Sequence, residues 1–159
     1  MSEVNIFRRK FMIQSGTLAC AMAIPAVASV SSASKKAIAK LSDIKLNEPI
    51  LFSYPEDESA YLLDLGKFVE NGAGPKRSIV AYSGLCQHMG CVVTFDEKSG
   101  HLVCPCHASA FDPSKNGDAL VGPTTTGLPA IRLSIEGDTV YALGVENGLV
   151  YGRSSNDVK

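Results

Sequence analysis

Short apolar runs separated by turn residues fill most of the chain, and this pattern favours strands over helices. Glu48–Tyr54 predicts a strand that ends before a proline, and Ser78–Tyr82 predicts a second. Between them, Asp57–Arg77 is rich in glycine and predicts mostly loop, with room for a short segment at Tyr61–Phe68. Gly148–Tyr151 predicts a final strand.

Two further pairs of runs predict β-hairpins. The first joins Cys91–Phe95 to His101–Cys104 through a polar tip that ends in glycine, and the second joins residues 130–135 to 139–143. The chain shows no internal repeat, no heptad pattern and no long amphipathic stretch. We therefore expect an all-β fold of small antiparallel sheets, with a subdomain at about residues 83–129 that holds the candidate chemistry.

The N-terminus resembles an export signal. The twin-arginine pair Arg8-Arg9 precedes a weakly apolar run at about residues 17–30, which is shorter than a membrane-spanning helix prefers. We expect residues 1–33 to be a twin-arginine signal that is either cleaved or kept as a short anchor, with Cys20 as part of it. This predicts a periplasmic protein, which would be associated with the membrane through its N-terminus if the signal is kept as an anchor.

Composition places the remaining residues, 34–159, in one compact domain. The full chain has a formal net charge of −1 and 45% hydrophobic residues, so no basic excess indicates a nucleic-acid partner. Residues 29–40 are rich in serine, alanine and lysine and predict a linker or a short helix. Four cysteines follow the signal, and an even number in an exported protein is typical of paired thiols.

Cysteine and histidine occur together in two short segments. The pattern is Cys86-x-His88, fifteen intervening residues, and Cys104-x-x-His107. Thiolates and imidazoles in these numbers can hold a [2Fe–2S] cluster with two sulfur ligands on one iron and two nitrogen ligands on the other. The first predicted hairpin would bring both segments to the same end of the domain.

Three alternatives explain the pattern less well. Structural zinc sites with two cysteines and two histidines use other spacings, and zinc would leave Cys91 and Cys106 unexplained. A thioredoxin-like site needs C-x-x-C, whereas Cys104 and Cys106 are one residue closer. A purely structural set of disulfides would give the histidines no role. We expect Cys91 and Cys106 to form a disulfide between the two segments; a pair of free buried thiols is the alternative, and export disfavours it.

The combination C-x-H-x-G-C and C-P-C-H-x-S resembles the Rieske iron–sulfur proteins, in particular the branch that carries the disulfide. The resemblance implies a Rieske-type antiparallel β-sandwich with a small cluster-binding subdomain and one [2Fe–2S] cluster. It also implies that Cys86 and Cys104 bind one iron, and that His88 and His107 bind the other.

The resemblance also implies roles for residues beside the cluster. Ser109 stands where the family often has a hydroxyl that donates to a cluster sulfide, which raises the reduction potential. Phe111 stands where respiratory bc-type proteins have a tyrosine, and Ala108 replaces a usual glycine, so we expect a potential below theirs. Residues 122–129 resemble the family's third loop, which covers the cluster. His101 belongs to no motif and is expected on the hairpin surface.

Several segments resemble the small subunit of arsenite oxidase: the twin-arginine leader, Val80–Ser83, Phe111–Pro113 and Gly148–Arg153. This implies a heterodimer in which a large molybdopterin and iron–sulfur subunit oxidises arsenite. This chain would then carry electrons to a cytochrome c or cupredoxin and would itself hold no substrate site. The alternatives are the same module in a related molybdoenzyme such as an iodate reductase, or the Rieske subunit of a quinol-oxidising bc complex.

Overall fold

The computed structural model describes residues 35–157. The predicted export signal, residues 1–33, lies outside them. The described part of the chain contains ten strands and a 3-10 turn at Leu41–Asp43, and no α-helix. None of its helical segments has the length and hydropathy to cross a membrane. The all-β prediction is confirmed.

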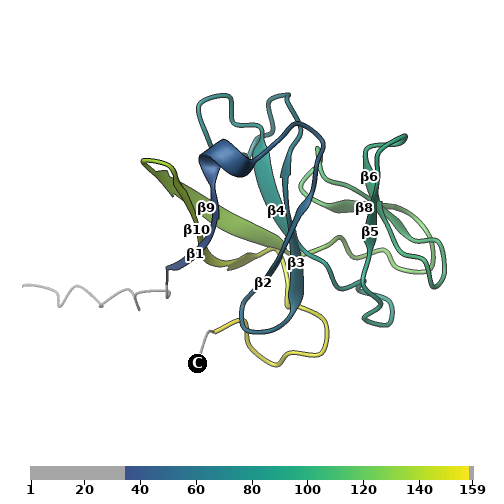
Figure 1. Ribbon diagram of the computed structural model, residues 1–159. Coiled ribbons are helices and arrows are strands. Elements are labelled where there is room, and N and C mark those ends of the chain that lie inside the picture. Colours follow the sequence, from purple (N-terminus) through teal and green to yellow (C-terminus); the bar gives the residue numbers. More distant parts are fainter. Residues whose placement is uncertain (1–34, 158–159) are drawn as a thin grey trace, which may run out of the picture. The chain divides into compact units, whose positions relative to one another are not determined.

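Six strands form the larger antiparallel sheet, in the order β1-β10-β9-β4-β3-β2 (Figure 1). Their bounds are β1 (Lys36–Lys40), β2 (Ile50–Ser53), β3 (Ser59–Asp64), β4 (Ile79–Ser83), β9 (Ala130–Glu136) and β10 (Thr139–Glu146). The β9–β10 hairpin was predicted from the sequence. β3 overlaps the short segment predicted at Tyr61–Phe68, but it begins two residues earlier and ends at Asp64.

The four-stranded sheet is inserted between β4 and β9. It has the order β5-β6-β7-β8, with β5 (Thr94–Asp96), β6 (His101–Val103), β7 (Ala110–Asp112) and β8 (Asp118–Val121). The insertion begins and ends on two neighbouring strands, because Tyr82 on β4 pairs with Ala130 on β9. The β5–β6 hairpin was predicted, whereas β7 and β8 were not.

β3 and β4 are buried on both faces, and successive residues enter different hydrophobic cores, as the two-residue period of a strand requires. Leu62 and Ala81 face a core within the six-stranded sheet, whereas Leu63 and Val80 face a core shared with the inserted sheet. The shared core contains the cysteines of the candidate site: Tyr61, Leu63, Val69, Val80, Tyr82, Cys86, Val93, Leu102, Cys104, Phe111, Leu128 and Ala130.

Two buried tyrosines join the insertion to the larger sheet. The Tyr61 hydroxyl donates to the Val93 carbonyl at 2.7 Å, and the Tyr82 hydroxyl donates to the Pro113 carbonyl at 2.8 Å. Burial raises the pKa of both phenols, and for Tyr82 the carboxylate of Asp112 adds to the effect. Both groups therefore remain protonated donors. This role could not be predicted from the sequence, because a tyrosine on a strand looks like any core aromatic residue.

The prediction of a linker or helix at residues 29–40 is wrong for its described part. Lys36–Lys40 forms β1, which pairs with β10 at the edge of the larger sheet. Ile38 and Ala39 are half-buried and pack against the core of that sheet. Alanine and lysine are good helix formers, but here the open edge of β10 supplies hydrogen-bond partners that outweigh local propensity.

The predicted strand at Gly148–Tyr151 is also absent. β10 ends at Glu146 because Asn147 and Gly148 adopt positive φ angles of 61° and 138°, which turn the chain away from the sheet. The following residues form turns and bends instead.

Candidate metal centre

The first cluster-binding loop, residues 84–93, leaves the end of β4 and is closed by its own backbone. The Val93 amide donates to the Gly84 carbonyl at 2.8 Å, and the Cys86 amide donates to the Cys91 carbonyl at 2.9 Å. The Gly90 amide donates to the Cys86 carbonyl at 2.8 Å. This ladder buries Cys86 at the neck of the loop and leaves the following residues nearer the surface.

The second loop, residues 104–109, connects β6 to β7. The Cys104 amide donates to the Ser109 carbonyl at 2.7 Å, and the Ala108 amide donates to the Cys104 carbonyl at 3.1 Å. Ala108 has a φ of 56°, in the left-handed region that glycine adopts more easily. The glycine usual at this position in the family therefore has a conformational reason. Cys104 is buried, whereas His107 is exposed.

The two loops bring the four predicted ligands together in pairs. Cys86 and Cys104 are free thiols, both buried in the shared core. The rings of His88 and His107 lie with their centroids 4.7 Å apart, at 81° to each other. The thiols therefore occupy the inner side of the site and the imidazoles the outer side, nearer solvent.

The donor atoms fit an iron–sulfur cluster. The Nδ1 atom of His88 is buried and has no hydrogen-bond partner among residues 35–157, as expected for an atom that binds metal. Burial raises the pKa of the Cys86 thiol, and the neighbouring Cys104 thiol adds to the effect, although the His88 amide acts in the opposite direction. Iron would hold both sulfurs as thiolates in spite of their burial.

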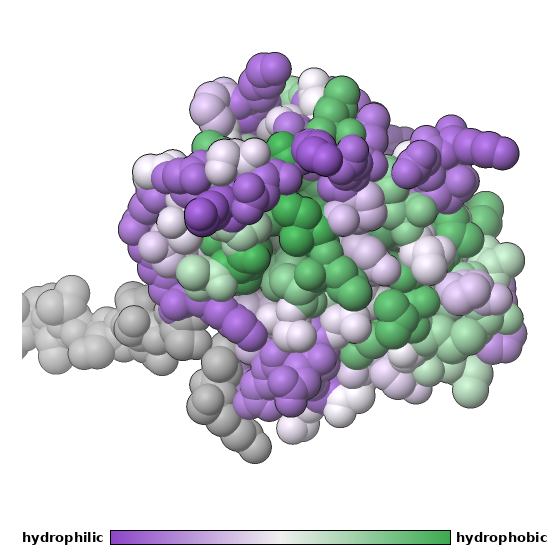
Figure 2. Space-filling model, in the orientation of Figure 1, coloured by the Kyte–Doolittle hydropathy of each residue, from purple (hydrophilic) through white to green (hydrophobic). Residues whose placement is uncertain are grey.

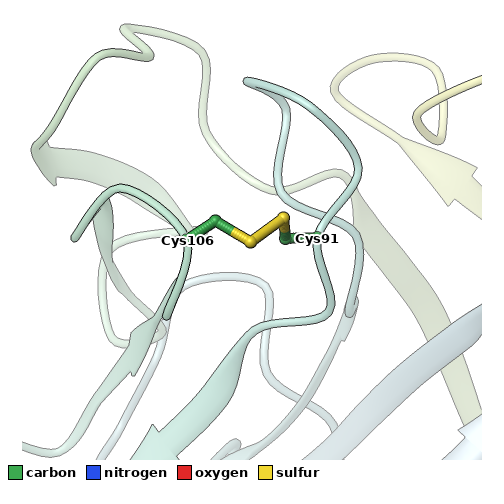
Figure 3. The surroundings of a disulfide bond; sticks show 2 residues. All are labelled: Cys91 and Cys106. Carbon is green, nitrogen blue, oxygen red and sulfur yellow. A yellow bond between two sulfur atoms is a disulfide. The ribbon is translucent and has the colours of Figure 1, made fainter.

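Cys91 and Cys106 form the predicted disulfide, which joins the two loops (Figure 3). Their Cα atoms are 6.5 Å apart and their sulfurs 2.02 Å apart. The Cys104 sulfur lies within 4.8 Å of both disulfide sulfurs. Of these three sulfurs only that of Cys104 is free to bind metal, so the disulfide is a neighbour of the ligands and not one of them.

Ser109 and Phe111 are the two residues predicted beside the cluster, and their position and effects there remain predictions. Both are fully buried, and the Phe111 ring is in the same core as Cys86 and Cys104. The Ser109 hydroxyl is buried, and no acceptor within residues 35–157 is placed for a hydrogen bond to it. A cluster sulfide would supply the missing acceptor.

The third loop, residues 122–129, runs from β8 to β9. Gly122 lies directly against Ser109, and Leu128 is buried in the shared core. His101 begins β6 in the predicted hairpin, opposite Asp96, and is half-buried there.

Comparisons with known proteins agree with this geometry. The family model of the Rieske [2Fe-2S] domain matches residues 35–132. Iodate reductase subunit IdrB of Denitromonas iodatirespirans is 36% identical over 94% of this chain and 85% of its own length. The subunit of the same name from Pseudomonas sp. (strain SCT) is 38% identical over 96% and 85%.

Among solved structures, the soluble domain of Rieske protein II (soxF) from Sulfolobus acidocaldarius has a TM-score of 0.69 at 20% identity. The alignment covers 81% of this chain and 87% of that one, which supports the fold. The chain therefore belongs to the Rieske [2Fe-2S] domain family, and its cofactor is one [2Fe–2S] cluster.

Proposed function

We propose that this chain is the electron-transfer subunit of a molybdenum enzyme of the iodate reductase type. The observation that carries the proposal is similarity over nearly the whole chain to two proteins named as iodate reductase subunits. This favours the iodate alternative over arsenite oxidase, which the sequence motifs had suggested first. Electrons would then flow from a cytochrome c or cupredoxin, through this chain, to a large molybdopterin subunit.

The residues of the site suit this role. Cys86 and Cys104 would hold one iron within the shared core, and His88 and His107 would hold the other at the loop tips. When bound, the cluster takes up and releases a single electron at a time. His107 is exposed, so a redox partner can approach the imidazole side, and the disulfide holds the two loops together there.

The surface beside the loops suits docking of another subunit. Met89 in the first loop and Val121 before the third loop are each 60% exposed, and Val92 is exposed as well. Figure 2 shows apolar side chains across the middle of the drawn face and toward its right-hand part, bordered by polar ones. Apolar residues at a protein surface are typical of interaction sites when they lie beside one another.

Export to the periplasm remains part of the proposal. Its supports are the Arg8-Arg9 pair in the sequence and the Cys91–Cys106 disulfide, since structural disulfides persist in oxidising compartments. A cluster inserted before export would require a route that carries folded proteins, which the twin-arginine signal would provide.

The test is to purify the tagged full-length chain with its bound partners and to measure molybdenum, iron and haem in the complex. We expect a large molybdenum-containing chain and iodate-dependent oxidation of reduced cytochrome c. Arsenite-dependent reduction of cytochrome c would instead support the arsenite oxidase alternative. A copurifying cytochrome b would indicate a bc complex. Either result would overturn the proposal. His107→Ala should lose the cluster and the activity, whereas the control His101→Ala should keep both.

A further inference from the structure

The chain after β10 folds back toward the cluster-binding loops. Residues 147–157, here called the C-terminal segment, contact two other parts of the domain and pass close to a third. A Cβ atom on Gly148 would lie 3.8 Å from Pro129 at the end of the third loop. Tyr151 lies against Gly90 of the first loop, and Arg153 pairs with the β2–β3 turn.

The contact between Tyr151 and Gly90 is the closest to the cluster. A Cβ atom on Gly90 would stand 2.5 Å from Cδ1 and 2.6 Å from Cε1 of the Tyr151 ring. The ring therefore lies on the bare backbone of Gly90, which is two residues from His88 and adjacent to the disulfide cysteine Cys91. Gly90 also has a φ of 73°, so both its conformation and this contact require glycine.

Arg153 anchors the segment at its other side. The side chain is only 13% exposed, and its Nη1 donates to Glu58 at 2.6 Å and to Glu56 at 3.3 Å. Its Nε and Nη2 donate to the carbonyls of Ser155 and Asp157, each at 2.9 Å. The hydrogen bond to Glu58 raises the pKa of Arg153, so the guanidinium is charged at any physiological pH.

Asn156 closes the segment around these two contacts, because it follows Arg153 and bonds to residues that precede Tyr151. Its Nδ2 donates to the Gly148 carbonyl at 2.7 Å, and its Oδ1 accepts from the Val150 amide at 3.0 Å. Val150 is fully buried, and its carbonyl accepts from the Arg153 amide at 3.0 Å. The position of Tyr151 is therefore fixed by its neighbours on both sides.

The anchor is itself attached to the base of the first loop. Glu58 precedes Ser59, whose carbonyl accepts a hydrogen bond of 2.7 Å from the Gly84 amide where that loop begins. The first loop is thus held at its base by β3, which begins next to Glu58, the partner of Arg153. At Gly90 the loop is held by the Tyr151 ring.

We propose that the C-terminal segment is a clamp on the first cluster-binding loop, with Tyr151 as a positioning residue that holds Gly90 and thereby His88 and Cys91. The clamp keeps the loop in one conformation, and so gives the cluster one uniform environment. The inference concerns this chain's own loop and depends on neither the proposed partner nor its substrate.

The test is hydrogen exchange on the full-length, cluster-loaded chain. In Tyr151→Ala, the amides of Cys86 and Gly90, which close the loop, should exchange about tenfold faster, which corresponds to about 1.4 kcal/mol of local opening. The EPR signal of the reduced chain should broaden, because the loop then samples several conformations. Tyr151→Phe should restore both readouts, since the ring and not the hydroxyl makes the contact.

Leu149→Ala is the matched control, because Leu149 is exposed to a similar degree, 49% against 40% for Tyr151. Equal loop exchange in Tyr151→Ala and Leu149→Ala would overturn the proposal, as would an increase spread evenly over all strands. Arg153→Ala should speed exchange of the same two amides, and the double variant should add little to either single one. An unchanged loop in Arg153→Ala would equally overturn the clamp.

Discussion

Gly122 and Ser109 are in closer contact than any side chain on Gly122 would permit. A Cβ atom on Gly122 would stand 2.4 Å from the Ser109 Cα and 2.5 Å from its Oγ. The backbone of the third loop therefore lies directly on the residue that ends the second loop. Two loops that are separate in sequence are thus in close contact here, and a single added atom on Gly122 would disturb the contact.

Gly122→Ala should destabilise the chain and cause cluster loss. Gly122 has a φ of 107°, so alanine adds backbone strain to the clash with Ser109. We expect a loss of roughly 3 kcal/mol or more in unfolding free energy. Gly137→Ala is the control, with a φ of 59° and nothing within 4 Å of the new atom; it should cost only about 1 kcal/mol. Thermal melts measure the stability of each variant, and visible absorption measures its cluster content. Equal losses of stability in the two variants would contradict the clash.

Ser109→Ala should lower the midpoint potential of the cluster. The buried hydroxyl has no acceptor among the described residues, and a bond to a sulfide would stabilise the more negative reduced state. A bond stronger by about 1.4 kcal/mol on reduction corresponds to roughly 60 mV. Ser134→Ala removes another buried, unpartnered hydroxyl on β9 and should leave the potential unchanged. Voltammetry compares them, and an unshifted Ser109→Ala would refute the role.

Phe111→Tyr should raise the potential by roughly 30–60 mV, because a phenol hydroxyl near the cluster adds a donor that favours the reduced state. Phe111 is fully buried in the core that contains Cys86 and Cys104. Phe52→Tyr, which adds a hydroxyl beside the other core, is the control and should not shift the potential. If Phe111→Tyr keeps its cluster and the midpoint potential stays constant or falls, the hydroxyl does not act as the expected donor.

Replacing both disulfide cysteines, Cys91→Ser with Cys106→Ser, should lower the unfolding free energy by about 3 kcal/mol. The bond closes a loop between residues 15 apart, and loops of this length contribute about that much through the unfolded chain. Denaturant titration measures the change. A reductant should shift the native chain to the same midpoint and leave the double variant unaffected; no difference between the two chains would mean the bond contributes nothing.

The pairing of Glu58 with Arg153 should make stability depend on acidic pH. Burial acts to raise the pKa of Glu58, but hydrogen bonds from Arg153 and the backbone outweigh it and hold the pKa below its ordinary value of 4.5. The stabilisation is therefore present above that ordinary value and is lost as the pH falls through the lower folded value. Between about pH 5 and pH 3, stability should fall more steeply in the native chain than in Glu58→Gln.

Glu48→Gln is the control for this comparison, since its partner Lys45 and Glu48 itself are both well exposed. Exposed pairs contribute little, so this variant should follow the native chain. Parallel curves for the native chain and Glu58→Gln would show that the Arg153 pair does not favour the folded state.

Much of the fold could be predicted because hairpins have strong local signals. The alternation at Thr94–Asp96 and His101–Val103, with glycine at the tip between them, is enough to define one. β1 could not be found this way, because its alanines and lysines carry no strand signal and the open edge of β10 decides its conformation. β7 and β8 are only three and four residues long, and each depends on a partner strand: β7 pairs with β6, and β8 pairs with β7.

Sequence patterns could predict candidate ligands, whose binding of iron stays a prediction, but not the residues that support them. Spacing and donor chemistry singled out Cys86 and His88, and the structure places them beside their counterparts in the second loop. The contact of Tyr151 with Gly90 was hidden, because it joins residues about sixty positions apart by shape alone. The substrate could not be predicted from any residue here, since the proposed function assigns that chemistry to another chain.

Because Tyr82 and Ala130 are paired neighbours, the segment between them could be transferred from one protein to another. The insertion between them begins and ends within one strand spacing, about 5 Å, so a tight turn could span the same two strands. Leu63 and Val80 would then lose the core that they share with the inserted sheet. The same segment could be transplanted between neighbouring antiparallel strands of an unrelated scaffold. The recipient protein would need two hydroxyl donors equivalent to Tyr61 and Tyr82 to bind the inserted segment.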